Sequence, residues 1–196
     1  MILEDGTGTN NSAKVNENNQ LEVKSESLVS ENVAAQRGES FIVHFECHLA
    51  AANSGALMSI TNNDQNYDLE VTRIYIDPHT LTPSDLIITQ VFDPTLVNGT
   101  DISSSAVVQK NRSDNSQFNL TVKASDSSSD LTYTGGTQYH SFPADSRKSS
   151  QRNMNGTNIL SKNKTIMWGY KTEGGGVATD GEVISLSVNI VKRLKE

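Results

Sequence analysis

Cysteine is almost absent from this chain, since Cys47 is the single example among 196 residues. One cysteine cannot close an intrachain disulfide, and the sequence has no Cys-x-x-Cys pair that would bind zinc or exchange thiols. We therefore expect a fold that is stable without covalent cross-links.

Excess positive charge and long apolar runs are also missing. The 16 Lys and Arg residues are outnumbered by 23 Asp and Glu, which gives a net charge of -7. Nucleic-acid binding depends mainly on basic side chains that neutralise phosphates, so nucleic acid is not an expected partner.

No apolar run approaches the roughly 20 residues that span a bilayer, and no leader pattern opens the chain. The sequence therefore predicts neither a membrane protein nor a visible secretion signal.

Large apolar side chains are scarce. Leu, Ile, Val and Phe make up about a fifth of the chain, near the lower limit for globular proteins, whereas Asn, Ser and Thr supply about 60 residues. A small core of this kind often gains stability by burying surface between subunits. We therefore expect a homo-oligomer.

The apolar residues that are present fall in short segments separated by turn residues. Alternation of apolar and polar side chains in residues 40–49 predicts a strand with one buried face, and Ile184, Leu186, Val188 and Ile190 alternate in the same way. The apolar phase switches at Thr72 and Arg73, which predicts a β-bulge there. The other predicted strands cover residues 56–61, 69–76, 86–92, 106–108, 118–124, 137–142 and 165–170.

No window of the sequence has a sustained helical period. The predicted fold is therefore all-β, an antiparallel β-sandwich of the jelly-roll type with an extended N-terminal arm. We assign the arm to residues 1–24, a linker to residues 25–39 and the sandwich domain to residues 40–196. The order of the strands cannot be read from this pattern.

The predicted arm is too polar to fold by burying its own side chains. Beyond Ile2, Leu3, Val15, Leu21 and Val23 it has almost no apolar content, so ordering it needs a surface supplied by another part of an assembly.

The same arm carries a resemblance to a known class of proteins. The strings that carry it are Glu4-Asp5-Gly6-Thr7-Gly8-Thr9, Ala13-Lys14-Val15-Asn16 and Asn19-Gln20-Leu21. They resemble the N-terminal stretch of small structural proteins of tailed bacteriophages, of the capsid-decoration or head-fibre type. The resemblance implies a place on the virion, favouring the outer surface of the capsid, with the major capsid protein or other virion subunits as partners. A trimer is expected by analogy with three-fold capsid positions.

Residues within the arm are the expected contacts with those partners. Val15, Leu21 and Val23 are candidates to fill shallow pockets, while Gly6 and Gly8 allow close approach of the backbone. Glu4 and Asp5 complete the predicted contact set.

A polar segment at residues 143–158 is a second candidate contact. It is predicted to be a long loop and holds Arg147, Lys148 and Arg152, the densest basic cluster in an acidic chain. Such a loop is either a solvated excursion or a contact with an acidic neighbouring subunit.

Motifs for catalysis and cofactors are missing from the sequence. There is no Gly-x-Ser-x-Gly, P-loop or dinucleotide fingerprint. We therefore expect a non-enzymatic protein without a cofactor. The alternatives are a neck, tail or fibre-anchor component of the virion, and a carbohydrate- or receptor-binding module.

Three weaker site hypotheses are open at this stage. Trp168 and Tyr170 are spaced to share one face of a strand, where they either stack on a sugar or, as we favour, pack in the core. His44 and Glu46 are two residues apart on one predicted strand face and are a weak candidate for metal binding. Asp64, Asn66 and Asp68 imitate the first ligands of a calcium loop, but Leu69 and Tyr75 break the pattern, which favours a plain turn.

Overall fold

A computed structural model describes residues 2–4, 12–15, 21–22, 34, 39–79, 85–109, 118–145, 148–154, 158–174 and 176–195. The chain divides into two compact units, Met1–Ser30 and Glu31–Glu196. The boundary lies within the predicted linker rather than at its start.

The N-terminal unit contains a small antiparallel sheet. Strands β1 (Ile2–Glu4), β2 (Ser12–Val15) and β3 (Leu21–Glu22) are arranged in the order β1-β2-β3. In register, Leu3 lies opposite Ala13, and Val15 lies opposite Leu21. The described residues of the predicted arm therefore pair with one another.

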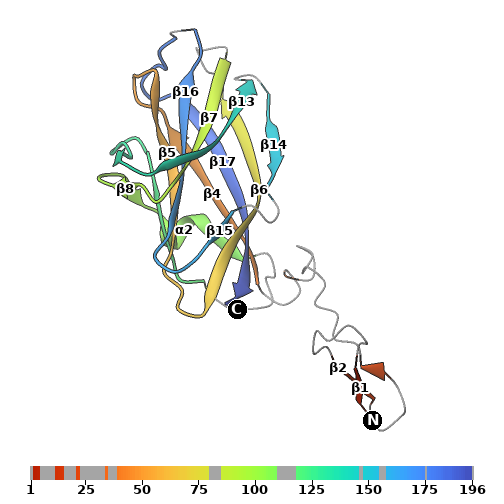
Figure 1. Cartoon of the computed structure of the whole chain (residues 1–196). Coiled ribbons are helices and arrows are strands. Elements are labelled where there is room, and N and C mark those ends of the chain that lie inside the picture. The colour runs from red at the N-terminus through yellow and green to blue at the C-terminus, as the bar shows by residue number, and fades with distance from the viewer. Residues whose placement is uncertain are drawn as a thin grey trace. The chain divides into compact units, whose positions relative to one another are not determined.

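The larger unit is a β-sandwich built from two antiparallel sheets (Figure 1). We call them the β4 sheet, in the order β10-β4-β17-β6-β14, and the β5 sheet, in the order β13-β7-β16-β5-β11-β9. Eight strands form the body of the two sheets: β4 (Ser40–His48), β5 (Ser54–Asn62), β6 (Tyr67–His79), β7 (Asp85–Phe92), β13 (Thr137–Asp145), β14 (Ser150–Asn153), β16 (Thr165–Thr172) and β17 (Val183–Leu194).

The order of these eight strands is that of a jelly roll. Numbered along the chain, the strands of one sheet run first, eighth, third and sixth, and those of the other run second, seventh, fourth and fifth. Successive strands therefore alternate between the sheets at every step except from β7 to β13, as in two nested Greek keys. The predicted jelly roll is confirmed by this order.

An insertion at residues 93–136, between β7 and β13, widens both sheets. It holds β8 (Thr95–Leu96), β9 (Thr100–Asp101), the short helix α2 (Ser103–Ala106), β10 (Val107–Gln109), β11 (Leu120–Ala124) and β12 (Tyr133–Thr134). Strand β10 pairs with β4 and β11 pairs with β5, while β12 pairs with β8 as a separate two-stranded sheet. The outer edges of β4 and β5 are thereby covered.

The core follows the alternation read from the sequence. Ile184, Leu186, Val188 and Ile190 are fully buried, and Phe41, Val43 and Cys47 of β4 are buried on the same inner side. Strands β17 and β6 shift register between Asn189 and Ile190, because Asn189 lies opposite Arg73 while Ile190 lies opposite Val71. Thr72 is the extra residue, so the predicted bulge is confirmed.

Lys192 closes the core near the end of β17. Its ammonium lies 5.2 Å from the ring centroid of Phe41 and 5.3 Å from those of Tyr67 and Phe118. An ammonium near aromatic faces is attracted to their negative quadrupole, and the lysine stem covers apolar surface. A charged residue thus continues the inward-facing series of β17 where the core ends.

The predicted loop at residues 143–158 is wrong in part. Strand β13 continues to Asp145, and β14 pairs with β6 inside the segment. A second short strand, β15 (Ile159–Leu160), pairs with β6 just beyond it. Strand β14 has no apolar residue and pairs only at the sheet edge, so it lacks the alternation that marks the inner strands.

Replacing Leu186 by Asp tests the inward face of β17. Leu186 is fully buried and lies in register between Phe45 and Ile76. An unpaired carboxylate there should lower the free energy of unfolding by more than about 3 kcal/mol, measured by urea denaturation.

The matched control is Ser187→Asp on the opposite face of the same strand. It replaces the hydroxyl that is hydrogen-bonded to His44 by a carboxylate that can accept from the same imidazole, and should cost no more than about 1 kcal/mol. Equal losses for both variants would contradict the assigned faces.

Candidate functional site

The predicted contact residues of the arm fall partly within the described strands. Glu4 ends β1, Val15 ends β2 and Leu21 begins β3. Asp5, Gly6, Gly8 and Val23 lie outside the described residues. The structure therefore places the segment in a sheet but leaves its partner contacts as predictions.

The basic cluster does not form one exposed loop. Arg147 lies outside the described residues, Lys148 is exposed, and Arg152 is on strand β14. The Arg152 guanidinium lies 5.5 Å from the ring centroid of Phe142 on β13. Because β14 and β13 are edge strands of opposite sheets, this contact covers the open side of the sandwich. Arg152 therefore has a structural partner within its own subunit.

Trp168 and Tyr170 are core residues. Their exposed fractions are 0% and 2%, and both belong to the main apolar cluster. The Tyr170 hydroxyl donates a hydrogen bond to the Ala50 carbonyl at 2.9 Å. Burial, with smaller contributions from the charges of Asp130 and Glu182, raises the pKa of Tyr170 to about 12. Neither ring is available to stack on a sugar, which confirms the preferred core interpretation.

Residues of both weak metal-site hypotheses form ordinary hydrogen bonds within the chain. The Asp64 carboxylate accepts hydrogen bonds from the backbone N–H of Asn66 at 2.9 Å and of Tyr67 at 3.2 Å, as in an Asx turn. His44 Nδ1 lies 2.7 Å from the Ser187 hydroxyl. Among the described residues, no three His, Cys, Asp or Glu side chains lie close enough together to hold a metal ion.

Cys47 is also a poor nucleophile. It is fully buried on the inner face of β4, and burial raises the pKa of its thiol well above the usual range. The thiolate that would react is therefore strongly disfavoured at neutral pH.

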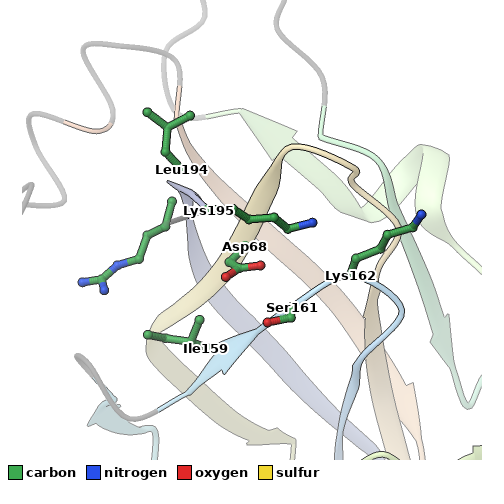
Figure 2. Close-up of a pocket in the computed structure, with 7 residues that line it drawn as sticks. Asp68, Ile159, Ser161, Lys162, Leu194 and Lys195 are labelled. Carbon is green, nitrogen blue, oxygen red and sulfur yellow. The ribbon is translucent and has the colours of Figure 1, made fainter.

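One pocket lies at the end of the jelly roll where β6 begins and β17 ends (Figure 2). This base pocket has a volume of about 600 Å³, and Figure 2 shows Asp68 and Lys195 between the apolar side chains of Leu194 and Ile159. Its full lining is Asp68, Ile159, Ser161, Lys162, Arg193, Leu194 and Lys195.

The cations of the base pocket are engaged within the chain. Arg193 forms an ion pair with the buried Glu70 at 2.6 Å, and the Lys195 ammonium donates to the Gln65 carbonyl at 2.8 Å. Lys162 donates to the Gln65 side chain. The basic side chains therefore stabilise this end of the sandwich and leave no cluster of uncommitted charge for an anion.

A second pocket lies between the outer face of the β5 sheet and the insertion. This Tyr133 pocket has a volume of about 430 Å³. It is lined by Ser54, Gly55, Ala56, Thr89, Leu131, Thr132, Tyr133, Gln138, Tyr170 and Lys171. Ala56 and Leu131 also join Val91 and Met167 in a small second apolar cluster. The insertion is thus packed onto the sheet beside the pocket that it helps to form.

No sequence signal nominated the Tyr133 pocket. Its residues come from β5, β7, β12, β13 and β16, together with the segment before β12. Only the strand register brings them together, so no spacing along the chain could have indicated them.

Comparisons with known proteins give no family. No protein family and no curated protein matches the sequence. A solved chain from desmodium yellow mottle tymovirus matches with a TM-score of 0.27 and 10% identity, covering 80% of this chain and 89% of that chain. The jelly-roll assignment rests on the strand order of this chain itself. No helix in the described part of the chain is long and apolar enough to cross a membrane.

Replacing Trp168 by Ala should destabilise the sandwich rather than remove a binding function. Trp168 is fully buried on a central strand, and truncation of a buried Trp typically costs about 3–5 kcal/mol. Urea denaturation monitored by circular dichroism measures the loss. A variant with unchanged stability and a lost glycan affinity would contradict the core assignment.

Proposed function

We propose that this protein is a non-enzymatic structural subunit of a virion, attached through its N-terminal unit. The observation that carries the proposal is the division of the chain into a complete jelly roll and a separate small sheet of Met1–Ser30. The jelly roll supplies a rigid body, and the small sheet supplies an attachment element.

The jelly roll supports this proposal through its architecture. Jelly rolls build viral shells, and they also occur in lectins and cupins, so the fold alone does not decide the function. The N-terminal segment favours the virion, because its Glu4-to-Leu21 strings resemble those of bacteriophage structural proteins.

The N-terminal unit is too short to be stable alone. It comprises Met1–Ser30, and units below about 40 residues usually need cross-links, metals or partners. In the described part of the unit, β1 and β3 each pair on one side only, with β2. A strand from a capsid subunit added at either edge would satisfy backbone hydrogen bonds and stabilise the sheet.

The proposed arrangement is a homo-oligomer on the outer surface of a capsid. A trimer suits three-fold positions, and linked subunits gain avidity because several N-terminal units bind at once. The second candidate within the virion is a neck, tail or fibre-anchor component, which would use the same attachment. The major capsid protein is the partner in the first case.

Deleting Met1–Ser30 tests the attachment. The shortened chain should keep the melting temperature of the intact protein, because the jelly-roll core lies wholly in the larger unit. Its binding to particles depleted of the protein should fall by at least about tenfold, measured by co-sedimentation.

The matched control is Val97→Ser, which changes a side chain that is 57% exposed in the larger unit. This variant should rebind like the intact protein. Equal rebinding by the shortened and intact chains would contradict attachment through the N-terminal unit.

A further inference from the structure

A row of small residues crosses the β5 sheet at the Tyr133 pocket. Ala56, Gly169 and Thr89 lie opposite one another on β5, β16 and β7. A Cβ atom on Gly169 would lie 2.6 Å from the Gly55 carbonyl oxygen and 3.0 Å from the Thr89 hydroxyl. The strands therefore approach closely here, and only the short side chains of Ala56 and Thr89 line the pocket from this row.

The walls of the pocket carry polar groups that have no partner within the described chain. These side chains are Ser54, Thr89, Thr132, Tyr133, Gln138 and Lys171. Between the residues that the structure describes, none of them makes a side-chain hydrogen bond or an ion pair. They are therefore free to exchange water for a ligand.

The outer face of the β4 sheet shows the opposite behaviour. There His44 is hydrogen-bonded to Ser187 at 2.7 Å and His79 to Ser185 at 2.8 Å. Ser149 donates to the Asp77 carboxylate at 2.6 Å. These polar groups satisfy one another, whereas the polar side chains of the Tyr133 pocket line an open space.

The lining chemistry indicates the kind of ligand. Hydroxyl and amide groups both donate and accept hydrogen bonds, which matches a ligand rich in hydroxyl groups. The Tyr133 ring is 38% exposed and offers an apolar face against which the C–H face of a sugar ring can pack. The volume of about 430 Å³ lies in the range of small-ligand sites.

Local charge favours a neutral ligand. Lys171 is the charged residue of the lining, and the other lining residues are uncharged. A polyanion such as nucleic acid would meet too little positive charge.

From these observations we infer that the Tyr133 pocket binds a short neutral oligosaccharide, stacked on Tyr133 and hydrogen-bonded by Thr89, Thr132 and Gln138. This goes beyond attachment to a particle, because it gives the exposed body of the protein a receptor-binding or glycan-binding role. The pocket lies wholly in the larger unit and does not depend on the N-terminal unit.

An NMR titration of the full chain tests the inference, with maltotriose, cellotriose, chitotriose and lactose as probes. At least one probe should shift the amide signals of Thr89, Thr132, Gln138 and Lys171, with a Kd of about 1 mM or tighter. Tyr133→Ala and Gln138→Ala should each weaken that binding by at least about tenfold without lowering the melting temperature.

Tyr139→Ala is the matched control. Tyr139 is 51% exposed on β13 and is not part of the pocket lining. Its ring packs against those of Phe92 and His140 at centroid distances of 5.4 and 4.8 Å. It should bind the probe like the intact chain. The inference is overturned if no probe shifts these signals at about 20 mM, if the shifts map elsewhere, or if the tyrosine variants lose affinity equally. Each of these results leaves particle attachment unaffected.

Discussion

The position of β17 is the constraint on which the rest of the structure depends. This strand, the last in the chain, lies in the middle of the β4 sheet and pairs with β4 over Val183–Val191 and with β6 over Val183–Leu194. Strand β16 occupies the corresponding central place in the β5 sheet. Neither sheet is complete until the C-terminal strands are in place, and pairing across such long sequence separations makes folding slow.

In this arrangement the central strands determine stability, whereas the proposed functional surfaces lie in other parts of the chain. The central strands have buried residues on both faces, as in β16, where Ile166, Met167 and Trp168 are all fully buried. Substitutions there change stability first. Substitutions that change the surface without changing the core are expected in the insertion at residues 93–136, in the edge strands and in the N-terminal unit. The Tyr133 pocket forms where the insertion meets the β5 sheet, so the wall formed by Leu131, Thr132 and Tyr133 can change without disturbing the central pairing.

Sequence reasoning succeeded where the pattern is local. Alternation along β17 and the phase switch at Thr72 each predicted a feature that the structure confirms, because one buried face imposes a two-residue period. It failed at β14, whose Ser-Gln-Arg-Asn sequence has no apolar face. It also gave no sign that Arg152 lies against Phe142, because Phe142 is on an edge strand of the other sheet. The Tyr133 pocket brings together Ala56 of β5 and Thr89 of β7 across the intervening β16, which only the register reveals.

Quantitative analysis of gradient-purified particles from the source of this chain tests the virion proposal most directly. The account predicts that the chain bands with the particles after a salt wash, in a fixed ratio to the major shell protein, because several weak attachments act together. A chain that remains in the soluble fraction while the particles band intact would contradict a structural role in the virion.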